Sequence, residues 1–243
     1  MASNQYPDRF LASNIKLVGE WRRLARQGSA TAQFQLGQFY FWGYLRRPNL
    51  KLAAKWYKLA ADQGHTKACY CFGHCLRHGL GVPVDFQYGL QYLFSAAKKG
   101  EGNSIYSIGV ALSFGEGTTQ NLKLAFNCYL AAADQGVPDA MYNVGYYYEH
   151  GKAGRKNYRL ARYWYRKSAM KGDVDAMVNL GVLLVNGQGG KANPKLALKW
   201  FRKSAQRKNK HAMFHIGRSY LHGDGVLKNP KRAHFWFAKA GQK

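Results

Sequence analysis

The hydrophobic and small residues of this chain recur with a period of 36 residues. A glycine occupies six positions at this interval, and a second glycine follows each of them six residues later. An alanine or serine stands five residues before each of the first glycines, and a pair of small residues closes each repeat. The first glycines are Gly37, Gly73, Gly109, Gly145, Gly181 and Gly217. Six sets in one register predict a repeat protein, in which each repeat buries its apolar face against its neighbours.

Each repeat predicts two amphipathic helices. In the fourth repeat, Ala140, Val144 and Tyr148 are spaced by four residues and form an apolar stripe on the first helix. A second helix is expected from residue 158 to 171. Its inward-facing residues are Ala161, Trp164, Tyr165, Ser168 and Ala169. We expect the glycine inside the first helix to permit close approach of a neighbouring helix, and the glycine that ends it to form a left-handed C-cap.

The repeat follows the pattern A-x3-[LV]-G-x2-[YL]-x2-G and then A-x2-W-[YF]-x2-[AS]-A, which resembles the Sel1-like repeat, a relative of the tetratricopeptide repeat. The loop signature G-x-G-V is complete at residues 79–82 and 223–226. The resemblance covers residues 29–243. It implies an all-α fold, a right-handed α/α solenoid in which first helices line a concave groove and second helices lie on the convex side. It also implies an adaptor, scaffold or inhibitor without chemistry of its own.

The register sets the expected domain organisation. Six repeats are expected at residues 29–64, 65–100, 101–136, 137–172, 173–208 and 209–243. Trp21 and Gly28 lie one period before Tyr57 and Gly64, so residues 14–28 continue the pattern backwards as a lone second helix. We therefore expect residues 1–28 to form an N-terminal tail and a capping helix, which repeat proteins use to close the end of the stack.

Composition limits the class of protein. Hydrophobic residues make up 47% of the chain and aromatic residues 15%, which is too apolar for a disordered chain. No apolar run approaches the roughly 18 residues of a membrane span. Asp8 and Arg9 interrupt the N-terminal region, and the four cysteines follow no regular pairing, so we expect no signal peptide and a cytoplasmic, reducing location. We also expect the chain to be monomeric on its own.

One helix concentrates residues that suit metal binding. Cys71, His74, Cys75 and His78 fall on one face of the first helix of the second repeat, and thiolates and imidazoles are good zinc ligands. Side chains along a single helix diverge, however, and two other repeats have histidine at the position of His78. We therefore expect core and groove residues here, with a zinc site as the less favoured alternative.

No catalytic set stands out in the sequence. The G-x-G segments are repeat loops and none ends in Gly-Lys-Ser/Thr, as a phosphate-binding loop does. The 12 Asp and Glu residues are too scattered for paired acid–base chemistry. A Cys–His pair on the helix above would lack a third group to orient it. We predict no enzymatic activity, no cofactor and no metal.

A first candidate binding surface is the groove face of the first helices, opposite their packed stripe. Its positions carry mainly Asn, Gln, His and aromatic residues, and amide side chains both donate to and accept from a peptide backbone. In tetratricopeptide-like grooves asparagines play that role, which favours Asn143 and Asn179. The alternative is that these positions are merely solvated. The predicted groove residues are Gln38, Trp42, His74, His78, Asn143, Tyr146, His150, Asn179, Asn186, His215, Arg218 and His222.

A second candidate surface is basic. The chain has 37 Lys and Arg against 12 Asp and Glu, a formal charge of +25, and residues 152–243 alone hold 22 against 3. Many of these residues recur at equivalent positions of the second helices, which predicts a continuous basic ridge on the convex side. The ridge residues are Arg155, Lys156, Arg159, Arg162, Arg166, Lys195, Lys199, Arg202, Lys203 and Lys231.

The charge indicates the kind of partner. A basic field attracts an acidic protein, an anionic membrane or nucleic acid, or serves only solubility. The tryptophans beside it, Trp164, Trp200 and Trp236, occupy a repeat position expected in the core, so no base-stacking platform is predicted. We predict an acidic protein partner, with an RNA-associated or ribonucleoprotein role as the alternative.

Overall fold

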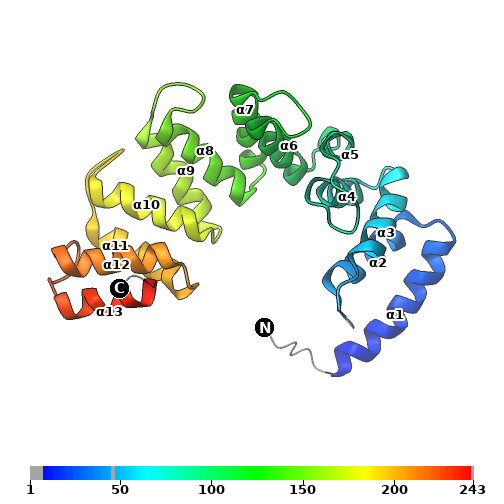
Figure 1. The fold of residues 1–243 in the computed structure, drawn as a ribbon, viewed down its shortest axis with the longest axis horizontal. Helices are drawn as coiled ribbons and strands as arrows, with labels where there is room; N and C mark the ends of the chain where they lie inside the picture. Colours follow the sequence, from blue (N-terminus) through cyan, green and yellow to red (C-terminus); the bar gives the residue numbers. More distant parts are fainter. Residues whose placement is uncertain (1–7, 45–46, 242–243) are drawn as a thin grey trace. The chain divides into compact units, whose positions relative to one another are not determined.

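The computed structural model describes residues 8–44 and 47–241, with side chains from residue 17 onwards, and every regular element in these ranges is an α-helix (Figure 1). The chain forms two compact units. Unit 1 ends at Asn121 and unit 2 begins at Leu122. The boundary falls inside the expected third repeat, between its two helices.

Unit 1 contains the long helix α1 and five helices of equal length. Their bounds are α1 (Asp8–Arg26), α2 (Ala30–Trp42), α3 (Leu50–Asp62), α4 (Thr66–His78), α5 (Phe86–Lys98) and α6 (Gly102–Phe114). Each helix packs against the next one along the chain. Helix α1 occupies the place of a second helix before the first repeat, and it begins earlier than residue 14.

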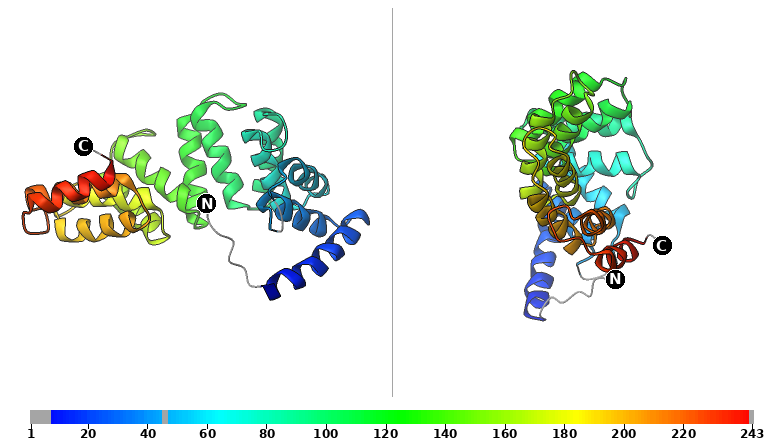
Figure 2. Two further views of the ribbon diagram at one scale, coloured as in Figure 1. Left: turned by 60° about the horizontal axis from the view of Figure 1, so that its bottom comes forward. Right: turned by 90° about the vertical axis from the view of Figure 1, so that its left-hand side faces the viewer.

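Unit 2 continues the same alternation of first and second helices. Its helices are α7 (Leu122–Asp134), α8 (Pro138–His150), α9 (Tyr158–Met170), α10 (Val174–Asn186), α11 (Pro194–Gln206), α12 (Lys210–His222) and α13 (Pro230–Ala240). First helices α8, α10 and α12 alternate with second helices α9, α11 and α13, and each packs on its sequence neighbours (Figure 2). A second helix was expected at residues 158–171, which agrees with α9 to one residue.

The helix ends follow from the sequence. Asn157, Asn193 and Asn229 precede α9, α11 and α13, and each side-chain oxygen accepts a hydrogen bond from the backbone N–H three residues later. Such a cap stabilises a helix by about 1 kcal/mol. Gly187 ends α10 with φ of 68°, and its N–H donates to the carbonyl of Leu183. The left-handed C-cap expected after the first helices is confirmed.

The glycine inside four of the first helices, α2, α8, α10 and α12, makes room for an aromatic ring of the following second helix, and Gly73 on α4 makes room for Leu93. A Cβ placed on Gly145 would lie 2.7 Å from Cδ1 of Tyr165, and one on Gly217 would lie 2.6 Å from Cδ1 of Phe237. Both distances are shorter than any ordinary contact between carbon atoms. The expected close approach of the two helices is therefore confirmed.

The core of unit 2 lies between the two helix layers. All five residues expected to face inward from α9 are buried. The tryptophans behave differently: Trp164 is buried, but Trp200 and Trp236 are only half-buried. The expectation that all three belong to the core was wrong, because the glycine pocket receives the residue after the tryptophan, such as Phe201. The tryptophan is the residue before it in the sequence, and its ring lies nearer the surface.

Replacing Gly145 with alanine tests the close approach. The added methyl would overlap the ring of Tyr165, so we expect Gly145→Ala to lower the free energy of unfolding by about 2–3 kcal/mol. Gly19→Ala in α1 is the matched control, because nothing lies within 4 Å of a Cβ there. That control should stabilise the helix by up to about 1 kcal/mol. Urea unfolding followed by circular dichroism measures both, and equal effects would contradict the packing described.

Candidate partner-binding surfaces

The predicted groove residues of unit 1 form a partly ordered polar surface. Trp42 is 60% exposed, and its Nε1 donates a hydrogen bond of 3.0 Å to Oε1 of Gln38. The amide of Gln38 in turn donates to Sγ of Cys71 on α4 at 3.6 Å. The rings of His74 and His78 lie 4.4 Å apart. These contacts hold one exposed aromatic side chain in place beside polar groups.

In unit 2 the predicted groove residues on α8 already contact one another. The rings of Tyr146 and His150 lie 4.2 Å apart, and the ammonium of Lys152 lies 6.0 Å from the Tyr146 ring. On α10, Asn179 donates a 3.5 Å hydrogen bond to the hydroxyl of Tyr142. Part of the hydrogen-bonding capacity of Asn179 is therefore used inside the protein.

Three other predicted groove residues meet around a shallow concavity between α10 and α12. Asn186, His215 and Arg218 line a space of about 50 Å³ together with Asp224. The imidazole of His215 stacks on Phe201 at 4.9 Å with 11° between the rings. Burial lowers the pKa of His215 to about 4, with a further contribution from the charges of Arg218 and His211. His215 is therefore a neutral packing residue near pH 7.

The cysteine–histidine helix has little capacity for thiolate chemistry. Burial raises the pKa of Cys71 and of Cys75 to about 12, and burial lowers the pKa of His74 to about 4. All four cysteines of the chain are free thiols. Over the described residues, no three His, Cys, Asp or Glu side chains are grouped as metal ligands.

The ridge residues of unit 2 lie where the sequence indicated, on the second helices and the loop before α9. Arg155, Lys156 and Arg159 are exposed, whereas Arg162 is half-buried and donates to the carbonyl of Lys191 at 3.3 Å. Together α9, α11 and α13 carry eleven Lys and Arg and no Asp or Glu. The exposed ridge residues on α9, α11 and α13 besides Arg159 are Arg166, Lys195, Lys199, Arg202, Lys203 and Lys231.

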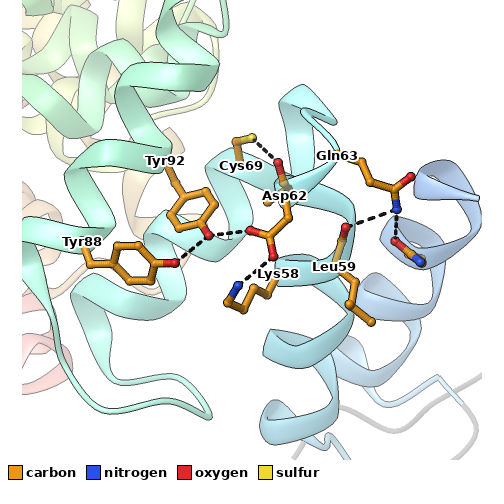
Figure 3. A network of polar contacts seen from close by, with 9 residues as sticks. Lys58, Leu59, Asp62, Gln63, Cys69, Tyr88 and Tyr92 are labelled. Atoms are coloured by element: carbon orange, nitrogen blue, oxygen red, sulfur yellow. Dashed lines mark hydrogen bonds and ion pairs between the residues drawn. The ribbon is translucent and has the colours of Figure 1, made fainter. Parts of the chain in front are cut away.

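On the corresponding surface of unit 1, one basic residue is neutralised by an internal ion pair. Lys58 pairs with Asp62 at 2.7 Å, and the hydroxyl of Tyr92 donates to the same carboxylate at 2.6 Å (Figure 3). Three repeats later, Arg166 stands in place of Lys58 and Met170 in place of Asp62. Among the described residues, ion pairs occur in unit 1 and none involves the basic residues of unit 2. The charge of unit 2 is therefore uncompensated.

An apolar cleft with a basic rim runs between α9 and α11. One part has a volume of about 320 Å³. A second part, about 360 Å³, lies nearer the ends of the two helices, and Trp200 borders both. We call the two parts together the α9–α11 cleft. The first part is lined by Arg159, Arg162, Tyr163, Arg166, Leu180, Leu184, Leu196 and Trp200, and the second by Ala169, Met170, Gly172, Met177, Trp200, Lys203, Gln206 and Arg207.

Sequence reasoning missed the apolar part of this cleft. Tyr163 is 50% exposed, Met170 70% and Leu196 37%, although the outer surface of these helices was predicted only as a basic ridge. Trp200 was assigned to the core. One feature of the sequence could have indicated the cleft: leucine stands at residue 184, where the preceding and following repeats have the larger Tyr148 and Tyr220.

Stacked helical hairpins with these two surfaces define the chain as an α/α repeat solenoid of the tetratricopeptide type. It belongs to the Sel1 repeat family, whose repeat matches residues 30–65, 66–101, 103–137, 138–173, 174–209 and 210–243. This confirms the resemblance and the all-α solenoid fold expected from the sequence. Sel1 repeat proteins generally mediate protein–protein interactions and are generally non-catalytic.

Solved structures and curated relatives agree with this assignment. The structure of c5321, described as a protective antigen of uropathogenic Escherichia coli with an SLR fold, is 29% identical with a TM-score of 0.83, over 92% of this chain and 48% of that one. A Sel1 repeat protein from Oxalobacter formigenes is 26% identical with a TM-score of 0.81, over 92% and 98%. Protein sel-1 homolog 2 of Mus musculus is 35% identical over 66 residues, or 27% of this chain and 10% of that protein. The match thus spans about a tenth of this relative's length. No helix in the described ranges is long and apolar enough to cross a bilayer.

The low pKa of His215 predicts a pH dependence of stability. An unfolded histidine has a pKa near 6.5, so the unfolded chain takes up this proton first as the pH falls. The stability that neutral His215 contributes is complete above about pH 6.5 and is lost as the pH falls from about 6.5 to 4. His215→Gln should therefore make the free energy of unfolding depend less on pH between pH 7 and 5. The control is His222→Gln, exposed on the same helix; parallel curves for both variants and the parent chain would contradict the assignment.

Proposed function

We propose that this chain is a non-enzymatic adaptor that binds an acidic protein partner through the basic second-helix surface of unit 2. The observation that carries the proposal is the uncompensated charge: eleven basic residues on α9, α11 and α13, with no carboxylate on those helices. Clustered charge of one sign steers an oppositely charged partner and raises its rate of association. A surface that binds no acidic partner can pair its basic residues with its own carboxylates, as Lys58 pairs with Asp62 in unit 1.

The surroundings of the aromatic residues favour a protein partner over RNA. Binding of single-stranded RNA uses exposed ring faces on which bases stack. Here the ammonium of Lys203 lies 4.7 Å from the Trp200 ring, and that of Lys167 lies 5.0 Å from the Tyr163 ring. These ring faces are therefore already in contact with cations, while the floor of the cleft is made of leucines. Apolar side chains of a protein suit such a floor better than bases do.

The groove face of the first helices is proposed as a second contact for the same partner. Trp42 offers an exposed aromatic ring in unit 1, and Arg218 with Asn186 offers polar groups in unit 2. We place the protein in a reducing compartment, which the free thiols favour. The ribonucleoprotein role is treated as an outcome of the test below.

Charge reversal on unit 2 tests the proposed function. The full chain is titrated with a glutamate-rich peptide and, separately, with polyuridylate, and affinity is measured by fluorescence anisotropy at several salt concentrations. We expect peptide binding to weaken by more than about tenfold in the variant Arg166→Glu/Lys199→Glu/Arg202→Glu, because like charges then face each other. Added salt should weaken the parent complex, because exposed charges are screened.

The matched control reverses three exposed lysines of unit 1, Lys51, Lys55 and Lys67, and gives the same net charge. It should bind the peptide nearly as the parent chain does. Equal losses in both variants would mean that net charge alone matters, and the proposal would fail. Tight binding of polyuridylate with weak binding of the peptide would assign the surface to RNA instead.

A further inference from the structure

The α9–α11 cleft is open at two leucines, Leu184 and Leu196, which differ from their equivalents in the following repeat. One repeat later, Tyr220 occupies the position of Leu184, and its hydroxyl accepts hydrogen bonds from Arg202 at 3.4 Å and Arg232 at 3.5 Å. Burial opposes ionisation of Tyr220, but the hydrogen bonds and charges of the two arginines lower its pKa overall. The gap between α11 and α13 thus contains a tyrosine held by two arginines.

The gap one repeat earlier is also filled by aromatic rings. Tyr148 occupies the position of Leu184 there, and the ring of Phe126 on α7 packs edge-on against it at 5.2 Å. Within unit 2, leucines stand at both deciding positions only between α9 and α11, with Leu184 where the next repeat has Tyr220 and Leu196 where it has Arg232. The missing volume is the apolar floor of the cleft.

The same substitutions leave arginines without internal partners. Arg166 is equivalent to Arg202, but no tyrosine hydroxyl reaches it, and among the described residues it forms no ion pair or hydrogen bond. Arg159 is likewise unbonded at the other end of the same rim, whereas Arg162 is tied to the loop through Lys191. Two arginines whose Cα atoms are about 10 Å apart along α9 therefore border an apolar floor.

Resting on the proposed function, we propose that the α9–α11 cleft docks an acidic amphipathic helix of the partner, with apolar side chains on either side of Trp200 and carboxylates on Arg159 and Arg166. The cleft follows helices of 13 residues, about 20 Å in length. A bound helix presents side chains at i and i+4 about 6 Å apart on one face, which suits two concavities divided by one indole ring. Lys203 borders the second concavity and meets the acidic residues that follow.

A pair of peptides separates the cleft from the general charge. The first probe is an acidic amphipathic helix of about 16 residues with leucines at i, i+4 and i+7 and glutamates beside them. The second has glutamine in place of each leucine and the same charge. We expect the full chain to bind the leucine peptide about tenfold or more tightly than the glutamine peptide, because only the first buries apolar surface.

The decisive variant closes the cleft without removing any positive charge. L184Y/L196R transfers the Tyr220 and Arg232 arrangement to the preceding repeat and raises the net charge by one. Attraction by charge alone predicts equal or tighter binding of the leucine peptide, whereas docking in the cleft predicts a loss of about tenfold. Circular dichroism and thermal unfolding check the fold. If the double variant does not fold, L196R alone replaces it, because Leu196 is 37% exposed.

Single charge reversals on the two rims supply the local control. R166E changes a residue that lines the cleft, while K199E changes the charge equally on α11 outside the cleft lining. We expect R166E to weaken the leucine peptide several-fold more than K199E does.

The outcomes separate this inference from the proposed function. Equal binding of the two peptides, unchanged binding by L184Y/L196R, or equal effects of R166E and K199E would overturn the docking site while leaving a general acidic-partner surface. Weak binding of both peptides would overturn the proposed function as well. In a further outcome, polyuridylate or phosphatidylserine vesicles displace the leucine peptide at lower concentrations than the unlabelled peptide does. That result would assign the cleft to RNA or to membrane, and it would also overturn the proposed docking of an acidic helix.

Discussion

The close contact between a helix glycine and an aromatic ring holds the helix hairpins of unit 2 together. In unit 2, Gly145 faces Tyr165, Gly181 faces Phe201 and Gly217 faces Phe237, and no side chain larger than hydrogen fits at the glycine. The contact fixes the distance and rotation of the two helices in a hairpin, since the ring must enter at one point. Every other position of the repeat then has a defined side, facing the core, the first-helix face or the outer surface.

That constraint explains which parts of the sequence are free to vary. Positions that serve the contact keep their character in nearly all repeats, while outer positions on the second helices change from Lys58 with Asp62 in unit 1 to Arg166 with Met170 in unit 2. Replacing the acid with a thioether removes the internal partner and adds exposed apolar surface at the same point. A scaffold of this kind acquires a binding surface without altering its core.

The extent of successful sequence prediction follows the same division. The register, the helix hairpins, the glycine C-caps and the inward-facing residues of α9 followed from the 36-residue period, because they obey a rule common to the repeats. The basic ridge followed from counting charges. The α9–α11 cleft did not, since it depends on the volumes of Leu184 and Leu196 together and on how far Trp200 is left exposed. The period shows which face of the helix a residue lies on, but it does not show how much volume the side chain at that position leaves unfilled.

A comparison of equivalent pairs shows why both positions matter. In unit 1, Leu76 is equivalent to Leu184, yet Tyr88 stands in place of Leu196 and its hydroxyl lies 2.9 Å from that of Tyr92, next to Asp62 (Figure 3). In the last repeat both positions are large, as Tyr220 and Arg232. A single leucine therefore does not suffice, because the neighbouring helix supplies a ring or a guanidinium to cover it. Within unit 2, both positions are leucine between α9 and α11, and there the described second-helix layer has an apolar cleft beside arginines that form no ion pair with a carboxylate.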